Sequence, residues 1–248
     1  MQPEVMNRIL NISREFYARF ADEFSATRQR IQPGVRRILD NIPLDSNVLD
    51  LGCGNGSISR SLADLEHRGL YVGIDSSEQL VGIARSENTH PRSRFLCEDI
   101  AVSDWHSKLD PVFDRVVSFA VIHHIPGGSE RVRLVRNAAS LMPRDGVMVV
   151  STWNFMASPR YRKRILPWEN VGISEDDVEP GDYLLDWRRG GRGIRYVHFF
   201  SEETLSALAE QAGMSVQRTF LSDGKNGILG LYQVWRQADN FDSLPPAW

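Results

Sequence analysis

Cysteine is scarce in this chain of 248 residues, which contains only Cys53 and Cys97. The two residues form no Cys-x-x-Cys pair and belong to no cluster with histidine. The sequence therefore predicts neither a zinc site nor a framework of disulfides. We expect a cytoplasmic protein without a bound metal.

Long apolar runs and an excess of positive charge are missing as well. No stretch approaches the roughly 20 apolar residues of a membrane-spanning helix. Charged residues interrupt residues 1–11, where a secretory signal would be apolar. The formal net charge is −3, so no overall positive field attracts the molecule to nucleic acid or to a membrane. We expect no membrane contact, and any contact with RNA has to come from a local patch.

The sequence does contain a regular alternation of short apolar runs with amphipathic stretches. This pattern predicts an α/β fold with a doubly wound, mostly parallel sheet of seven strands, in a single domain over residues 1–248. The expected strands are residues 47–51, 69–74, 94–97, 113–120, 147–152, 214–220 and 228–235. The last two would form an antiparallel pair after a helix at residues 201–212.

Two of the connecting helices have recognisable start signals. Ser76 is a candidate N-cap, because Gln79 follows it three residues later as in a capping box. Ser129 is a candidate N-cap for a helix that continues through Leu141. Both helices fall between predicted strands, as a doubly wound sheet requires.

The alternation breaks over residues 153–198, a segment too long for an ordinary loop. We predict an insertion after the fifth strand that recognises the substrate. It carries arginine clusters at residues 160–164 and 188–195, and phosphate contact plus base stacking would use arginine with aromatic rings. The aromatic residues interleaved with these clusters are Trp168, Tyr183 and Trp187. Acidic residues nearly balance the arginines, so a solvated surface or an internal network of ion pairs is the alternative.

A glycine-rich turn is the strongest local signal. The apolar strand ends at Asp50, and Gly52, Gly54 and Gly56 follow at alternate positions before a helix. Glycine allows a positive φ and a close approach of the backbone to a ligand. A ligand would lie at the carboxyl end of the strand, against the helix N-terminus. We predict a nucleotide-type site, and a purely structural turn is the alternative.

The spacing of the glycines separates two ligand classes. A dinucleotide fingerprint reads G-x-G-x-x-G, whereas this turn reads G-x-G-x-G, so a nicotinamide-dependent oxidoreductase is the weaker alternative. Asp50 suits a ligand with a cationic amino group and a sulfonium. Asp75 ends the second strand, where it can accept both ribose hydroxyls. Asp99 follows the third strand, where it can accept a hydrogen bond from an adenine amino group.

Together, these features resemble the class I S-adenosylmethionine-dependent methyltransferases over residues 35–152. The resemblance rests on residues 48–56, Asp75, residues 98–100 and residues 113–118. It implies a Rossmann-like methyltransferase fold and S-adenosylmethionine as the cofactor. It also implies that the loop after the fourth strand lines the pocket, which brings His123 and His124 near the cofactor unless they only pack beneath the sheet edge. The cofactor-binding candidates are Asp50, Gly52, Cys53, Gly54, Asn55, Gly56, Asp75, Ser76, Asp99, Ile100, Phe119, Ala120, His123 and Arg28.

A narrower resemblance concerns the methyl acceptor. The stretches at residues 16–28, 181–187 and 195–200 are similar to the methyltransferases that esterify the carboxymethyl group of wobble uridines in tRNA. This similarity implies that Arg195, Tyr196 and His198 lie near the acceptor carboxylate, with Arg195 as its charge partner. The catalytic candidates are Tyr17, Arg195, Tyr196 and His198. Residues 1–34 would form a helical lid over the cofactor, or an amphipathic helix that packs on the sheet.

Methyl transfer from a sulfonium is an in-line displacement, so the protein mainly has to hold donor and acceptor in line. A general base is needed only for an acceptor that must lose a proton. We predict a carboxyl O-methyltransferase for a tRNA wobble uridine, with arginines of the insertion on the tRNA phosphates. The alternatives are a small-molecule methyltransferase of the same fold and a non-catalytic cofactor-binding subunit. Whether a small protein partner is needed stays open.

Overall fold

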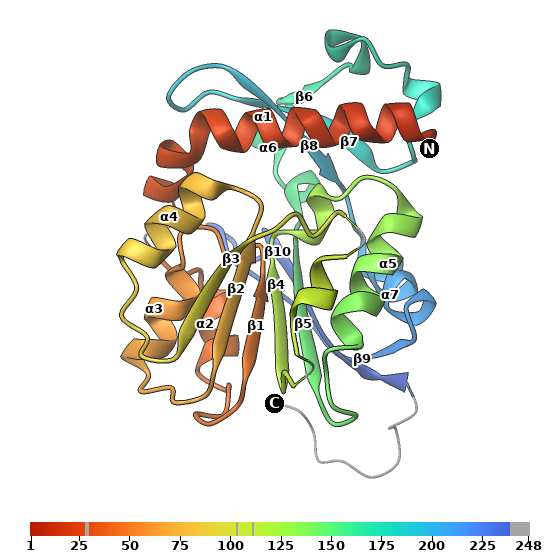
Figure 1. Cartoon of the computed structure of the whole chain (residues 1–248). Coiled ribbons are helices and arrows are strands. Elements are labelled where there is room, and N and C mark those ends of the chain that lie inside the picture. The colour runs from red at the N-terminus through yellow and green to blue at the C-terminus, as the bar shows by residue number, and fades with distance from the viewer. Residues whose placement is uncertain (28–29, 103, 111, 239–248) are drawn as a thin grey trace.

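A central sheet of seven strands organises the molecule (Figure 1). The computed structural model describes residues 1–27, 30–102, 104–110 and 112–238, without the side chains of Phe24 and Thr27. The strand order is β3-β2-β1-β4-β5-β10-β9, with β1 to β5 parallel and β10 antiparallel to both of its neighbours. The strands are β1 Val48–Leu51, β2 Tyr71–Asp75, β3 Ser93–Cys97, β4 Arg115–Phe119, β5 Val147–Trp153, β9 Met214–Ser222 and β10 Gly230–Gln237. The predicted doubly wound fold is confirmed.

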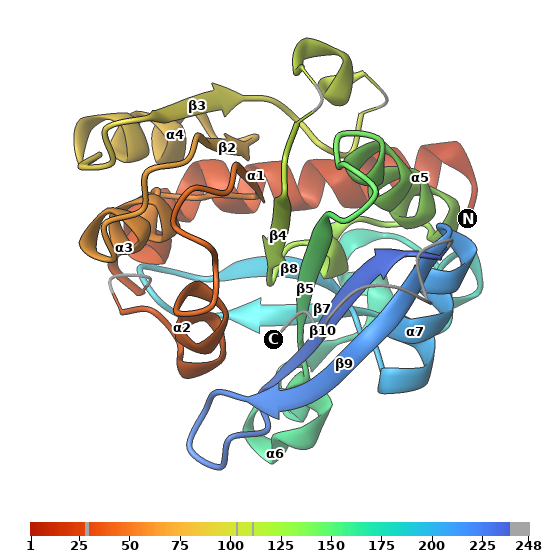
Figure 2. The same cartoon turned by 90° about the horizontal axis from the view of Figure 1, so that it is seen from below.

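Helices cover both faces of this sheet (Figures 1 and 2). Side chains of α2, α3 and α4 pack on one face, and those of α5 and α7 pack on the other. The helices are α1 Pro3–Thr27, α2 Pro33–Leu39, α3 Ser57–Asp64, α4 Glu78–Ser86, α5 Gly128–Ala139, α6 Pro159–Arg162 and α7 Glu202–Gln211. The central strands are mostly apolar because both of their faces are covered.

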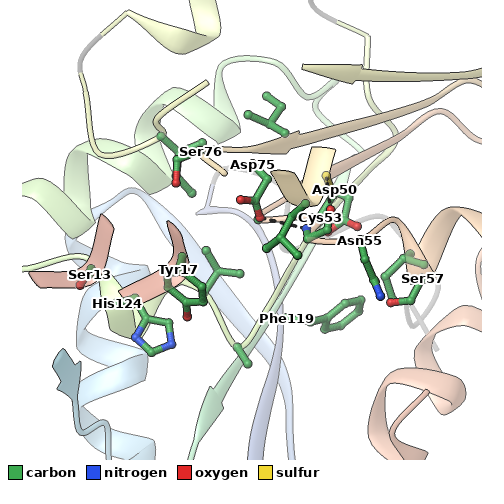
Figure 3. Close-up of a pocket in the computed structure, with 18 of the residues that line it drawn as sticks. Ser13, Tyr17, Asp50, Cys53, Asn55, Ser57, Asp75, Ser76, Phe119 and His124 are labelled. Atoms are coloured by element: carbon green, nitrogen blue, oxygen red, sulfur yellow. Dashed lines mark hydrogen bonds between the residues drawn. The ribbon is translucent and has the colours of Figure 1, made fainter. Parts of the chain in front are cut away.

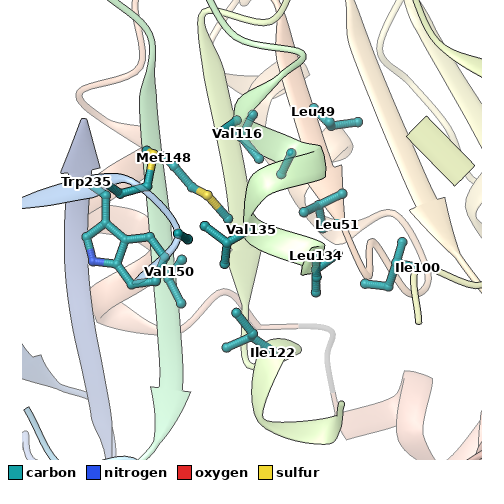
Figure 4. Close-up of a cluster of buried hydrophobic side chains, with 14 of the residues drawn as sticks. Leu49, Leu51, Ile100, Val116, Ile122, Leu134, Val135, Met148, Val150 and Trp235 are labelled. Carbon is teal, nitrogen blue, oxygen red and sulfur yellow. The ribbon is translucent and has the colours of Figure 1, made fainter. Parts of the chain in front are cut away.

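The larger of the two cores lies between the sheet and α5 with α7. Figure 4 shows Leu134 and Val135 of α5 against Val116 and Val150 of the sheet, with Trp235 of β10 beside them. Each of these side chains is almost completely buried. Burying one such side chain contributes about 1.5–3 kcal/mol, so this packing fixes where the strands end and hence where the loops that follow them lie.

Both predicted helix caps are wrong by one or two residues. Ser77, and not Ser76, caps α4, because the Ser77 hydroxyl accepts the backbone N–H of Leu80. Asp75 accepts the N–H of Ser77 and so fixes the turn before that cap. The N-cap of α5 is Gly127 at φ 84°, a left-handed conformation that glycine adopts without strain, so Ser129 already lies inside the helix.

The segment between β5 and α7 folds into a second, smaller sheet. Its antiparallel strands are β6 Ile165–Leu166, β7 Asp182–Trp187 and β8 Gly193–His198, in the order β6-β7-β8. Short 3-10 helices, η3 Phe155–Ala157, η4 Trp168–Val171 and η5 Glu175–Asp177, occupy the connections. The break in alternation was predicted but these strands were not, because β6 has two residues and β7 mixes polar with apolar side chains.

Helix α1 connects the second sheet with the main one. Figure 1 shows it lying across the end of the main sheet where β6, β7 and β8 also lie, and α1 packs against β8 and α4. The helix bends at Phe20, whose φ of −117° and ψ of 22° are not helical. Gly193 sits against the Phe20 ring, where a Cβ would come within 2.5 Å of it. None of the helices in the described ranges is long and apolar enough to cross a membrane.

Candidate active site

The glycine turn between β1 and α3 folds as a close-approach loop. Gly52 has φ 75°, and a Cβ there would lie 2.3 Å from a methyl group of Val121. Gly56 is the N-cap of α3 with φ 74°. Any other residue would be strained at both positions. The turn therefore exposes its backbone at the carboxyl end of β1.

Asp75 is fixed where β2 ends. One carboxylate oxygen accepts the backbone N–H of Gly54 and the other accepts that of Ser77, both at 2.9 Å. Burial is the main influence on this group and raises the pKa of Asp75, against the lowering effect of these hydrogen bonds. The carboxylate thus ties the glycine turn to the loop that precedes α4.

Asp50 lies deeper, at the end of β1, and its side chain is almost inaccessible to solvent. The Tyr71 hydroxyl donates a hydrogen bond of 2.6 Å to it. Burial raises the pKa of Asp50 to about 7, because the hydrogen bond from Tyr71 offsets the desolvation of the carboxylate only in part. A cationic group placed nearby would favour the ionised form.

Asp99 already has a partner from the N-terminal helix. Arg14 of α1 forms an ion pair with it at 2.6 Å, and the backbone N–H of Ala101 donates to its other oxygen. Both side chains are partly exposed, so the pair adds little stability and serves mainly to orient α1. Arg14 was not among the predicted site residues.

A first cavity lies between the carboxyl ends of β1, β2 and β4 and one face of α1 (Figure 3). Most of the predicted cofactor residues line it, namely Asp50, Gly52, Cys53, Gly54, Asn55, Asp75, Ser76, Asp99, Ile100, Phe119 and Ala120. Tyr17 and His124 line it too. Gly56 and His123 do not line it, since Gly56 lies behind the turn as the cap of α3 and His123 faces the second cavity. Arg28 lies outside the described residues.

The residues of α1 that line this cavity share one helical face. Leu10, Ser13, Arg14 and Tyr17 are spaced i, i+3, i+4 and i+7. Of these four, Tyr17 was predicted as a site residue, whereas the neighbouring Phe16 and Phe20 point elsewhere: they pack around Trp187 of the second sheet. In the sequence, the face with Ser13, Arg14 and Tyr17 therefore marks the cavity wall, and the face with Phe16 and Phe20 does not.

A second cavity adjoins the first and opens between the main sheet and the second sheet. The arginines that line it are Arg160, Arg164, Arg188, Arg189 and Arg195. The acidic residues that line it are only Asp186, which is paired with Arg188, and Asp223. The lining of this cavity is therefore cationic, although the chain as a whole is acidic.

Arg195 is enclosed by aromatic rings. Its guanidinium carbon lies 5.6 Å from the centre of the Phe16 ring, 4.9 Å from that of Trp153 and 5.8 Å from that of Trp187. Such stacking holds the planar guanidinium in one orientation. Of the three aromatic residues singled out in the insertion, Trp187 alone lines the cavity, whereas Trp168 packs on Tyr196 and Tyr183 on Phe155.

Tyr196 and His198, predicted near the acceptor, line neither cavity. Both are buried and both donate a hydrogen bond of 2.7 Å to the same oxygen of Asp182. Successive side chains of a strand point to opposite faces, so Arg195 and these two neighbours cannot enter the same cavity. Of the predicted β8 residues, the structure brings only Arg195 to the second cavity.

The two cavities share a wall. Its residues are Gln32, Val35, Phe119, Ala120 and His124. Ala120 has φ 57°, an unusual conformation for a residue other than glycine, and its N–H donates to the Ser151 carbonyl. A ligand in the first cavity and one in the second would meet at this wall. Among the described residues, no group of three or more side chains is arranged to bind a metal ion.

Comparisons with known proteins agree with this geometry. A family model described as a methyltransferase domain matches residues 21–219. A protein of Encephalitozoon cuniculi described as a methyltransferase is 32% identical over 202 residues, which cover 81% of this chain and 86% of that protein. The tRNA (carboxymethyluridine(34)-5-O)-methyltransferase of Schizosaccharomyces pombe is 27% identical over 225 residues, covering 82% of this chain and 88% of that protein. A solved S-adenosylmethionine-dependent methyltransferase of Methanosarcina mazei has a TM-score of 0.64 at 22% identity, covering 84% of this chain and 98% of that one.

The chain therefore belongs to the methyltransferase domain family. It is an enzyme with the fold of the S-adenosylmethionine-dependent methyltransferases. The predicted class is confirmed, and the nicotinamide-dependent alternative has no support.

Proposed function

We propose that this enzyme binds S-adenosylmethionine in the first cavity and transfers its methyl group to the carboxymethyl group of a tRNA wobble uridine in the second. The cofactor part is supported by the family and by three carboxylates, Asp50, Asp75 and Asp99, that line one cavity at successive strand ends. The acceptor part is supported by the similarity to the fission yeast enzyme over most of both chains.

Each carboxylate has a separate task in this proposal. Asp75 accepts the ribose hydroxyls, and Asp50 offsets the positive charge of the sulfonium and the amino group. Asp99 accepts from the adenine amino group while it keeps Arg14, since a carboxylate has room for several donors. Helix α1 then forms a lid over the cofactor.

The shared wall is the observation that carries the proposal. A methyl group bound beside Phe119, Ala120 and His124 would face directly into the second cavity. Holding donor and acceptor in line while keeping water out is most of what methyl transfer requires. A carboxylate acceptor needs no base, because it is ionised near pH 7.

Residues 153–198 supply the acceptor side. Arg195 would pair with the carboxylate of the carboxymethyl group, and Trp187 or Trp153 offers a face for the base. Arg160, Arg164 and Arg189 would hold phosphates on either side of the modified nucleotide. The net charge of −3 does not oppose this, because five arginines line this one cavity.

A small protein subunit is a further part of the proposal. In the described part of the chain, β3 is the outermost strand on its side of the main sheet and pairs only with β2. An open strand edge accepts a strand from another chain, which is one way for a subunit to attach. The complex is purified from its host by size-exclusion chromatography. Gel electrophoresis of the peak would show such a subunit as a second band of defined stoichiometry.

Nucleoside mass spectrometry tests the function directly. tRNA from a strain that lacks this protein is incubated with the purified enzyme and isotope-labelled S-adenosylmethionine. We expect one labelled nucleoside, the methyl ester of carboxymethyluridine, that mild alkali converts back to the acid. An unlabelled tRNA pool together with a labelled small-molecule extract would assign the second cavity to a small acceptor instead. Binding of S-adenosylmethionine without any turnover would indicate a non-catalytic subunit.

A further inference from the structure

The wall shared by the two cavities contains one side chain that can exchange a proton. Of its five residues, Gln32, Val35, Phe119 and Ala120 do not titrate, and the fifth is His124. His123, the next residue along the chain, lines only the second cavity. Among the described residues, His124 is therefore the proton acceptor that lines both cavities.

The hydrogen bonding of the ring determines its tautomer. Nδ1 of His124 lies 2.8 Å from the backbone carbonyl oxygen of Tyr196. A carbonyl oxygen only accepts, so Nδ1 carries the hydrogen and donates it. In the neutral ring the lone pair is then on Nε2. This is the arrangement by which a histidine acts as a general base, with one nitrogen anchored and the other basic.

The anchor itself is rigid. Tyr196 pairs with Leu184 across the second sheet, and its buried hydroxyl donates to Asp182. The His124 ring also packs edge-on against Tyr17 of α1, with ring centres 5.9 Å apart (Figure 3). The ring is thus held by the main sheet, the second sheet and α1 together.

We propose that His124 is a general base that takes the proton of a neutral acceptor, so that this enzyme also methylates hydroxyl groups bound in the second cavity. The inference rests on the proposed function for the positions of donor and acceptor. Transfer to a carboxylate does not use such a base, because a carboxylate has no proton to lose near pH 7. The base therefore extends the acceptor class from carboxylates to alcohols and phenols.

The step balances without a further reactant. A lone pair of the hydroxyl oxygen forms the new oxygen–carbon bond as the sulfur–carbon bond breaks, and its electron pair stays on the sulfur. The hydroxyl proton moves to Nε2 of His124, which becomes an imidazolium and later releases the proton to water. The products are an ether and the neutral thioether S-adenosylhomocysteine.

Two matched RNAs test the inference. One is an anticodon stem-loop with 5-carboxymethyluridine at the wobble position, and the other carries 5-(2-hydroxyethyl)uridine there, which replaces the carboxyl group by a CH₂OH group. Each is incubated with the enzyme and labelled S-adenosylmethionine, and kcat and KM are measured for both. We expect transfer to both RNAs, with a slower reaction on the hydroxyl.

The variants separate a base from a merely structural residue. His124→Asn keeps an amide N–H that reaches the Tyr196 carbonyl but has no basic nitrogen. We expect kcat on the hydroxyl RNA to fall about 100-fold, the usual contribution of a general base, with KM unchanged. Because His124 also lines the wall beside the methyl group, transfer to the carboxyl RNA reports any effect of the substitution on cofactor position. That transfer should fall much less than transfer to the hydroxyl RNA, since it needs no base. Imidazole added to His124→Ala should restore part of the hydroxyl reaction and leave the carboxyl reaction unaltered.

The outcomes distinguish the two proposals. If the wild type methylates the carboxyl RNA and not the hydroxyl RNA, the inference is wrong and the proposed function stands. If it methylates only the hydroxyl RNA, the carboxyl acceptor is wrong and the inference stands. Loss of both reactions to the same degree in His124→Asn, without imidazole rescue, would make His124 structural and overturn the inference. Transfer to neither RNA contradicts both proposals.

Discussion

At the scale of single residues, the protonation of Asp50 links the charge of the site to stability and to ligand binding. Its pKa is raised to about 7 by burial, so a large share of the ligand-free molecules hold it protonated near neutrality. A ligand with an ammonium and a sulfonium group favours the ionised form. Binding of S-adenosylmethionine should therefore release a proton.

The first prediction is a pH-dependent affinity. Between pH 5.5 and 7, the association constant for S-adenosylmethionine should rise by up to about 10-fold per pH unit, because Asp50 must ionise to pair with the ligand. Calorimetry in two buffers of different ionisation enthalpy measures both the affinity and the proton released. Asp50→Asn should bind more weakly and with a flatter pH profile, and equal pH dependence in the variant and the wild type would refute the role of Asp50.

The second prediction concerns the stability cost of the same group. The pKa of Asp50 is 3.8 in its unperturbed state and about 7 in the fold, so folding favours the protonated form. The resulting penalty is absent below pH 4, grows as pH rises to 7 and is constant above that. Between pH 5.5 and 8, the wild type should lose about 2 kcal/mol of unfolding free energy relative to Asp50→Asn. Urea unfolding of both ligand-free proteins at the two pH values measures this difference. If the unfolding free energy changes by the same amount in both proteins, the predicted penalty from Asp50 is ruled out.

At the scale of elements, strand β8 divides its side chains between two tasks. Arg195 enters the second cavity, whereas Tyr196 and His198 turn toward Asp182. The Asp182 cluster extends to α5, where Glu179 accepts the N–H of Gly128 and pairs with Arg131. Along β8, the side chain that enters the second cavity therefore lies next to side chains that hold the second sheet together.

A third prediction follows from this division. Tyr196→Phe should lower the unfolding free energy by about 1–3 kcal/mol, because the buried Asp182 loses a hydrogen bond, while kcat/KM falls little in protein that is still folded. Arg195→Gln should instead act on binding, with a KM for RNA at least about 10-fold higher. Thermal unfolding and steady-state kinetics of both variants measure these effects. A Tyr196→Phe enzyme that is stable but inactive would return Tyr196 to the catalytic role first expected of it.

The contrast between sequence and structure is clearest for the same elements. The strands β1 to β5 and the glycine turn were predictable, because a buried parallel strand is continuously apolar and a positive φ requires glycine. The candidates Arg195, Tyr196 and His198 were also found from the sequence. Which of them face the second cavity could not be predicted, because β8 was not recognised as a strand. Arg14 and Tyr17 belong to one helical face, yet their partners are Asp99 and His124, more than 80 residues away in the chain. Such pairings depend on packing that local patterns do not encode.

At the scale of the whole molecule, five arginines line one cavity of a chain with a net negative charge. If Arg160, Arg164 and Arg189 contact phosphates, the affinity for RNA should fall steeply with salt. The slope of log K against log salt should lose about 0.7 for each such contact that is removed. The number of arginines that contact phosphates thus determines how steeply RNA binding depends on salt.

The fourth prediction applies that rule. Arg164→Gln together with Arg189→Gln should lower the slope by about 1.4 and weaken RNA binding at low salt, with the affinity for S-adenosylmethionine unchanged. Arg94→Gln, an exposed arginine on β3 that lines neither cavity, is the matched control. Filter binding or fluorescence anisotropy across a salt series measures the slopes. Equal slopes for the double variant and the control would remove the arginines from the RNA interface.

A crystal structure with S-adenosylhomocysteine tests the central claim most directly, since that claim concerns where the donor lies. We predict the ribose hydroxyls on Asp75, the amino group on the Asp50 side, and the sulfur at the wall of Phe119, Ala120 and His124, open to the second cavity. A ligand whose sulfur points away from that wall, or one bound among the arginines of the second cavity, would contradict the account.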